Sequence, residues 1–187
     1  MEPGVRGGTV AEIETDRLLL RRWRDEDLEP YARICADPEV MRFVGGVRTR
    51  DEAEARIGMF VRHWEERRFG MWAVEEKASG GFVGFVGLLY QDDWPEGEHK
   101  IEVGWRLDRR FWGRGLATEG ALASLRYGFE ERGLERIISM TVPENVASWR
   151  VMQKIGLTYR GETRWRGVDV VWYAIDRKMW EARGQKS

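Results

Sequence analysis

A chain of 187 residues with 42% hydrophobic and 34% charged residues has the composition of one globular domain with a full core. Its formal net charge of −1 disfavours nucleic-acid binding, which normally requires a basic excess. No apolar run reaches the length of a membrane span and no signal peptide precedes Glu12, so we expect neither a nucleic acid nor a membrane as a partner.

The N-terminal half predicts one strand and two helices. Residues 1–11 are glycine-rich and unpatterned, and we interpret them as a loose tail. Residues 17–23 predict a strand. A short helix follows with Asp27 as its N-cap, because Pro30 is tolerated only in a first turn, and Asp37-Pro38 ends it. A second helix begins at the capping box Thr49-x-x-Glu52, and its apolar stripe is Ile57, Phe60, Val61 and Trp64.

The remaining elements alternate between strands and helices. Residues 71–76 and 82–90 predict a hairpin, and a polar loop covers 91–99. Then follow a strand at 101–107, a helix at 115–131 ended by Gly133, a strand at 136–142 stopped by Pro143, a helix at 145–155, and an antiparallel pair at 158–165 and 169–179. This order predicts an α+β fold of mixed layers with about seven strands and about four helices. We expect a single domain over residues 12–183, with a second tail at 184–187.

The turn between the strand at 101–107 and the helix after it is typical of an anion site. The first N–H groups of a helix are unpaired and the helix dipole favours negative charge there. Gly113 and Gly115 would let the backbone come close to a diphosphate, because neither has a Cβ. The turn is not a P-loop, since no Lys-Ser or Lys-Thr follows, and Thr118 stands where a dinucleotide fingerprint has its third glycine. Taken alone, the motif also fits an ordinary strand-to-helix connection.

Two ordered motifs and an opening strand resemble the GCN5-related N-acetyltransferases (GNAT). Arg110, Gly113 and Gly115 match the signature R/Q-x-x-G-x-G/A. Residues 144–157 match the second motif, N-x-x-S-x-x-V-x-x-K-x-G-F/L, one helix and one strand downstream. Residues 14–21 resemble the first strand of the RimJ/RimL-like branch, which acetylates protein N-termini and various small amines, and the match runs from about residue 12 to residue 180.

The resemblance implies a GNAT-type fold, with a central, mixed, mostly antiparallel sheet, and acetyl-CoA as co-substrate. The diphosphate would bind residues 110–118, namely Arg110, Phe111, Trp112, Gly113, Arg114, Gly115, Leu116, Ala117 and Thr118. The pantetheine arm would pair with Trp105, Arg106 and Leu107 where that strand splays from the next, a splay that the sequence does not reveal. Asn145, Ser148 and Lys154 of the second motif would also contact the cofactor, and Asn145 caps its helix in any case.

Ser148 and Glu102 are the candidate catalytic residues. Many members of the wider family carry a tyrosine four residues beyond Ser148 as proton donor to the leaving thiolate, but here that residue is Met152. In the RimJ/RimL-like branch a serine at the Ser148 position is the usual substitute, and a CoA thiol is acidic enough to leave without an acid. Glu102 is the candidate base, because desolvation in an apolar strand raises a carboxyl pKa. The alternative is that Glu102 lies at a sheet edge and forms an ion pair with a lysine or an arginine.

These observations predict an acetyl-CoA-dependent N-acetyltransferase that acts on a primary amine by direct transfer in a ternary complex. The acceptor stays open between a protein N-terminus and a small molecule, and Asp92, Asp93 and Asp169 are weaker candidates to orient a cationic one. The alternatives are a transferase for another acyl-CoA, such as succinyl-CoA, and a non-catalytic CoA-binding sensor. The sequence leaves the oligomeric state open, a dimer included.

The one cysteine and the two histidines of the sequence argue against a metal site and against a covalent enzyme intermediate. Cys35 is the one cysteine, which excludes an internal disulfide and suits a reducing cytoplasm. It shares a helical face with Tyr31 and other core residues, so we expect a packing role. His63 and His99 are far apart and no Cys/His cluster has zinc spacing, so we expect no metal.

Overall fold

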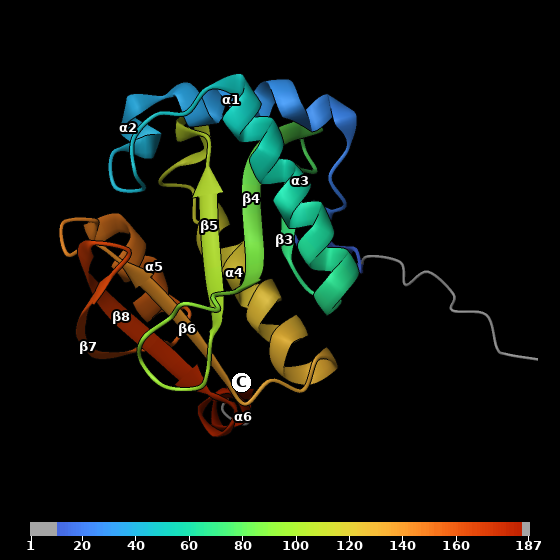
Figure 1. The fold of residues 1–187 in the computed structure, drawn as a ribbon. Coiled ribbons are helices and arrows are strands. Elements are labelled where there is room, and N and C mark those ends of the chain that lie inside the picture. The colour runs from blue at the N-terminus through green and yellow to red at the C-terminus, as the bar shows by residue number, and fades with distance from the viewer. Residues whose placement is uncertain (1–10, 185–187) are drawn as a thin grey trace, which may run out of the picture.

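The computed structural model describes residues 11–184, which form one twisted sheet covered by helices on both faces (Figure 1). The strands are β1 (Ile13–Glu14), β2 (Leu18–Arg21), β3 (Met71–Glu76), β4 (Gly81–Tyr90), β5 (Ile101–Leu107), β6 (Arg136–Thr141), β7 (Thr158–Trp165) and β8 (Val168–Asp176). The α-helices are α1 (Leu28–Ala36), α2 (Pro38–Met41), α3 (Arg50–Arg67), α4 (Leu116–Arg126), α5 (Val146–Lys154) and α6 (Arg177–Gly184).

The sheet has the order β1-β2-β3-β4-β5-β6-β8-β7. Every neighbouring pair is antiparallel except β5 and β6, which run parallel. A parallel pair needs a crossover connection, and α4 supplies it. The mixed, mostly antiparallel α+β architecture predicted from the sequence is therefore confirmed, with eight strands rather than about seven among the described residues.

Alternation along β4 divides the apolar residues between two faces of the sheet. Phe85 and Leu89 face a cluster with Tyr31 and Cys35 of α1 and Phe60 of α3. Val86 and Leu88 face the larger core on the other side, which contains Leu116, Ala121 and Leu125 of α4 and Met152 of α5. The sheet is thus covered by α1 and α3 on one face and by α4 and α5 on the other (Figure 1).

The helix α3 begins as predicted and buries Phe60 and Trp64 of the predicted stripe, with Ile57 partly buried beside them. Thr49 caps it, its side chain accepts from the Glu52 N–H, and the reciprocal bond of the capping box is present. Of the predicted stripe, Val61 is 38% exposed, whereas His63 is buried. The inward face consists of Ala53, Phe60, His63 and Trp64.

Three elements differ from the sequence prediction. The first helix ends at Ala36, before Asp37-Pro38, as predicted. Pro38 also starts α2, which was not predicted, since Asp37 accepts from the Glu39 N–H and a proline needs no partner at the first position. The last strand was predicted to reach residue 179, but it ends at Asp176 and α6 follows. The helix places Trp180 on Phe129, stacked with ring centroids 5.6 Å apart. The short strand β1 was not predicted either.

The predicted tails fall mostly outside the described residues. Ala11 is described, and its carbonyl accepts a 2.7 Å hydrogen bond from the Trp72 indole N–H. Gly184 is described as the last residue of α6. No helix within residues 11–184 is long and apolar enough to cross a membrane.

Candidate active site

The strands β5 and β6 separate soon after they meet. Within residues 11–184 their pairing consists of Glu102 with Ile138, although β5 continues for five further residues to Leu107. The Ser139 hydroxyl donates to the Val103 carbonyl at 2.9 Å and closes the narrow end. Beyond that point the two strands diverge. The strand β5 runs toward the end of the sheet that lies near α1, and β6 leads to α5 (Figure 1). The splay that the sequence did not reveal is therefore present.

The diverging strand presents unpaired backbone groups to the opening. Hydrogen bonds from Gln91 N–H to Lys100 C=O and from Asp108 N–H to Val83 C=O show that even-numbered residues of β5 bond to β4. Odd-numbered residues therefore direct their N–H and C=O groups toward β6. The Leu107 carbonyl accepts from the Trp112 indole at 2.9 Å. The N–H and C=O of Trp105 and the N–H of Leu107 are left to pair with an extended ligand arm.

The glycine turn opens at the wide end of the splay. Gly113 and Gly115 adopt φ of +72° and +78°, the left-handed region that favours glycine. A Cβ at Gly113 would meet no atom within 4 Å, so the space beside it is open. Gly115 is the N-cap of α4, and within the described chain no protein group accepts from the N–H groups of residues 113–118. These exposed donors at a helix N-terminus suit a diphosphate.

Charged side chains around the turn are held by partners. Arg17 binds Glu119 in the first turn of α4 at 2.6 Å and donates to the Arg114 carbonyl at 2.8 Å, which ties the opening strand to the turn. Arg110 pairs with Asp108 at 2.7 Å, and the Arg114 guanidinium pairs with Glu76. Of the two predicted features of this motif, the open backbone is seen directly, while a cofactor contact of Arg110 stays a prediction.

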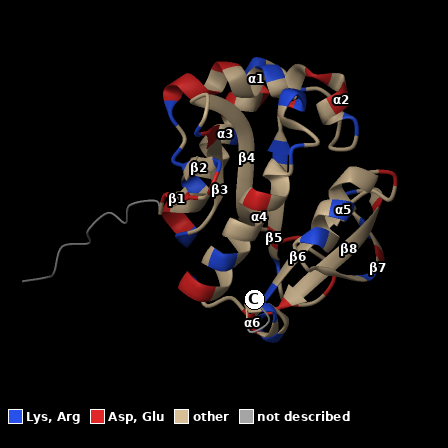
Figure 2. Cartoon of the chain, turned by 180° about the vertical axis from the view of Figure 1, so that it is seen from behind, with Lys and Arg blue, Asp and Glu red and all other residues tan. Residues whose placement is uncertain are grey.

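The second motif forms the other wall of the splay. Asn145 caps α5 as predicted, since its Oδ1 accepts from the Ser148 N–H at 3.3 Å, and its Nδ2 donates to Thr141 Oγ1 at 2.9 Å. Ser148 is half-buried, and its hydroxyl makes no hydrogen bond within the described residues. Met152 is fully buried in the core, so no side chain there can protonate a leaving group. Lys154 is exposed at the end of α5, a helix that carries basic segments in Figure 2.

Glu102 stands where β5 and β6 begin to part. Burial raises the pKa of its carboxyl, and the Gln91 amide that donates to it acts in the opposite direction. Gln91 in turn accepts from Arg166 at 3.1 Å, and Arg166 is paired with Asp93 at 2.8 Å. Asp93 is thus engaged by a cation, and Asp169 pairs with Arg164 at 3.1 Å. Glu102 has no ion pair among the described residues, so the sheet-edge alternative does not describe it.

Cys35 and His63 have packing roles rather than catalytic ones. Cys35 is fully buried in the cluster between α1 and α3, as predicted. His63 is buried, its Nε2 accepts from the Tyr90 N–H at 3.0 Å, and its Nδ1 therefore donates to the Phe69 carbonyl at 2.8 Å. No group of three or more His, Cys, Asp and Glu residues within residues 11–184 is arranged to hold a metal ion.

Sequence reasoning missed Gln91, Arg166 and Arg56. Gln91 and Arg166 come from loops 75 residues apart, and only the fold brings their side chains to Glu102. Arg56 left a signal, because it occupies a core-facing position of α3, three residues beyond the buried Ala53. A charged residue on an apolar helical face is a candidate for function.

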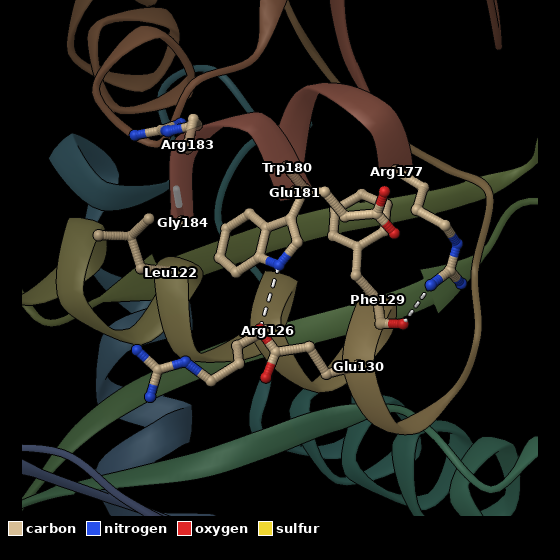
Figure 3. Close-up of a pocket in the computed structure, with 9 residues that line it drawn as sticks. All are labelled: Leu122, Arg126, Phe129, Glu130, Arg177, Trp180, Glu181, Arg183 and Gly184. Atoms are coloured by element: carbon tan, nitrogen blue, oxygen red, sulfur yellow. Dashed lines mark hydrogen bonds between the residues drawn. The ribbon is translucent and has the colours of Figure 1, made fainter. Parts of the chain in front are cut away.

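A pocket of about 570 Å³ lies elsewhere, between α4 and α6 (Figure 3). None of the predicted site residues lines it. Some of the polar groups there have partners: Arg177 donates to the Phe129 and Leu134 carbonyls, and the Trp180 indole donates to Glu130 at 3.2 Å.

Known proteins are similar to this chain in sequence and in fold. The family model for the acetyltransferase (GNAT) domain matches residues 17–158. An uncharacterised N-acetyltransferase of Bacillus subtilis, YnaD, is 34% identical over 150 residues, which are 80% of this chain and 84% of that protein. The ribosomal protein uS5 alanine N-acetyltransferase of Escherichia coli is 26% identical over 160 residues, covering 80% and 79% of the two chains. It connects the chain to the RimJ/RimL-like branch at low identity.

A solved structure of an acetyltransferase resembles this fold. The crystal structure of a GNAT-family acetyltransferase from Bacillus anthracis superposes with a TM-score of 0.76 at 29% identity, and the match covers 90% of this chain and 99% of that one. The family model also spans the parting strands, the glycine turn and the capped α5. This chain therefore belongs to the GNAT acetyltransferase family and is an N-acetyltransferase.

Proposed function

We propose that this protein transfers an acetyl group from acetyl-CoA to a primary amine by direct attack, with both substrates bound together. The splay between β5 and β6 carries the proposal, because it leaves three backbone groups of Trp105 and Leu107 free beside an open helix N-terminus. An extended arm that ends in a diphosphate satisfies both features at once. A free adenine nucleotide would use only the turn.

Direct transfer needs a base but no enzyme nucleophile. The amine nitrogen attacks the thioester carbonyl carbon, the nitrogen loses a proton, and the C–S bond breaks as the amide forms. Glu102 receives the proton, directly or through water, because its carboxylate stands at the narrow end of the splay and its raised pKa makes it a better base. The backbone N–H of Trp105 or Leu107 faces the opening and would stabilise the developing oxyanion.

Ser148 is the proposed donor to the leaving sulfur. Its hydroxyl is free, whereas its backbone N–H is held by Asn145, so the side chain is oriented without being consumed. Since a CoA thiol also leaves as a thiolate, Ser148 assists the step without being essential to it. The remaining cofactor contacts proposed are those of residues 110–118 and Lys154. The Arg106 backbone bonds to β4, so it is not free to pair with the pantetheine arm.

Release of free CoA in the presence of an amine panel tests the proposal, with acetyl-CoA and succinyl-CoA compared side by side. Turnover of acetyl-CoA with intersecting initial-rate plots is the expected result. Parallel plots would indicate an acetyl-enzyme instead. CoA binding without turnover of any amine would identify a sensor module, and preference for succinyl-CoA would identify another acyltransferase.

A further inference from the structure

Two arginines without an ion-pair partner in the described part of the chain lie close enough to act electrostatically on one another beside the proposed active site. Arg56 of α3 and Arg106 of β5 are half-buried, and neither forms an ion pair within residues 11–184. The Arg56 Nε is fully buried and has no hydrogen-bond partner in the described part of the chain. Buried cations normally have partners, because an unpaired guanidinium loses hydration without compensation.

Two neighbouring aromatic rings contact the guanidinium groups of Arg56 and Arg106. The Arg106 Cζ lies 5.5 Å from the Phe85 ring centroid and the Arg56 Cζ lies 5.3 Å from that of Phe60. The two rings are neighbours, with centroids 5.1 Å apart. The guanidinium groups therefore sit side by side over one apolar surface, an arrangement that strengthens their attraction for an anion by excluding water.

Tyr31 adds a neutral donor to the same place. Its ring lies 6.0 Å from Phe85, its side chain is fully buried, and its hydroxyl has no oxygen or nitrogen partner among residues 11–184. Burial raises the pKa of this phenol, so it keeps its proton and can donate it. Burial lowers the pKa of Arg56 and the neighbouring Arg106 adds to this shift, while Tyr31 and the Glu102 carboxylate act in the opposite direction.

The register connects this cluster to the proposed base. Glu102 and Arg106 are four residues apart on β5, so both side chains project from the same face as Phe85. Gly104 lies between them without a side chain, and a Cβ there would come within 3.5 Å of the Glu102 carboxylate. The Met71 Cε would lie 3.2 Å from the same Cβ, so Gly104 and the buried Met71 side chain lie between the Glu102 carboxylate and the two arginines.

We infer that the acceptor is a small primary amine that also carries an oxyanion, with the amine at Glu102 and the oxyanion held by Arg56, Arg106 and Tyr31. This inference rests on the proposed function and specifies its substrate class. The remaining charges near the cluster are already neutralised, since Arg166 holds Asp93 and Arg48 lies 3.8 Å from Glu52. A ligand with one amino group and one oxyanion would match the charges that stay unpaired among residues 11–184, which are the Glu102 carboxylate and the guanidinium groups of Arg56 and Arg106.

Turnover of matched amines tests the inference. The probes are glycine, β-alanine, γ-aminobutyrate and the common α-amino acids, each beside its own amide, with phosphoethanolamine as the phosphate counterpart. Charge-assisted hydrogen bonds predict a kcat/KM at least tenfold higher for an acid than for its amide. Equal turnover of acids and amides, or acetylation of peptide N-termini alone, would overturn the inference while leaving the acetyltransferase function intact.

Arg56→Met and Arg106→Met locate the effect. Methionine keeps the apolar stem over Phe60 or Phe85 but removes the charge. The acid-to-amide ratio of kcat/KM should fall at least tenfold in each variant. Arg62→Met, on the exposed face of the same helix, is the matched control and should keep the wild-type ratio. Thermal midpoints of all three variants establish that they fold.

Direct binding separates failure of this inference from failure of the proposed function. If no amine is turned over, the proposed function is wrong, and calorimetry of the acids against protein saturated with CoA decides the inference. Binding of the acids that Arg56→Met weakens at least tenfold, and Arg62→Met does not, would support the oxyanion site. Absence of binding, or equal binding of the amides, would refute it.

Discussion

Replacing Gly115 by aspartate should weaken CoA binding and leave the fold intact. The new carboxylate would stand at the N-cap of α4, beside the exposed N–H groups proposed to hold a diphosphate. Two like charges about 5 Å apart repel by about 3 kcal/mol at an effective dielectric constant of about 20. A Cβ at Gly115 would lie 3.5 Å from Arg17 Nη2, and a surface attraction of this kind returns up to about 1 kcal/mol. The expected loss is therefore about 2 kcal/mol, a factor of about 30 in Kd.

The cost to stability should be small. Gly115 has φ of +78°, which aspartate and asparagine tolerate better than other side chains. An N-cap aspartate also accepts from the first helical N–H groups and interacts favourably with the dipole. These contributions oppose one another, so we expect the thermal midpoint to stay within about 4 °C of wild type for a chain of this length.

Calorimetric titration with CoA at fixed ionic strength measures the effect, with two control variants. Gly115→Asn adds a side chain of the same shape without charge, so the ratio of the two dissociation constants isolates the electrostatic part. Gly97→Asp places the same residue at another left-handed glycine, with open space around it and φ of +80°, and should bind CoA normally. If folded Gly115→Asp binds CoA within threefold of Gly115→Asn, charge repulsion at the turn is wrong, and the diphosphate binds elsewhere.

Four further outcomes follow from the same geometry. Glu102→Gln should lower kcat by about 100-fold. In the wild type, kcat/KM should rise with pH above the ordinary glutamate pKa, because burial raises the pKa of this carboxyl. Gln91→Leu should shift this rise of kcat/KM to higher pH, and an unshifted pH profile would show that the Gln91 amide does not stabilise the charged base. Ser148→Ala should reduce turnover about tenfold with little change in CoA affinity, and wild-type turnover at saturating substrates would remove the hydroxyl from the mechanism. Cys35→Ala should lose about 1 kcal/mol of stability through the small cavity but keep its activity, and mass spectrometry of the protein after incubation with acetyl-CoA should find no acetyl group at Cys35. Burial lowers the pKa of His63, whose Nε2 must stay unprotonated to accept from the Tyr90 N–H. The imidazole therefore binds a proton more readily in the unfolded chain, and the free energy of unfolding should fall as pH drops below about 6.5. If the urea midpoint of His63→Gln has the same pH dependence as that of the wild type, this account is wrong.

Local signals in the sequence identified the parts of the site that lie on single segments. The glycines of the turn, the cap at Asn145 and the substitution of Met152 for a tyrosine are all properties of a few adjacent residues, and backbone sterics and capping act over that range. Most helices and strands were predicted for the same reason. The exceptions are short or context-dependent: α2 has four residues, and α6 replaces a predicted strand extension because Trp180 finds Phe129 to stack on.

Only the tertiary structure decided what surrounds the reacting atoms. The splay depends on how β6 twists away after its pairing at Glu102, and no residue within β5 encodes that direction by itself. Gln91 reaches Glu102 and Arg166 reaches Gln91 because separate loops fold to one edge of the sheet. Arg56 and Arg106 come from a helix and a strand 50 positions apart, and they become one cationic cluster only when Phe60 packs on Phe85. The sequence by itself determined the family, the fold class and the backbone that suits a cofactor, because these depend on local order along the chain. The chemistry of the acceptor depends on contacts between distant segments, which packing of the core alone brings together.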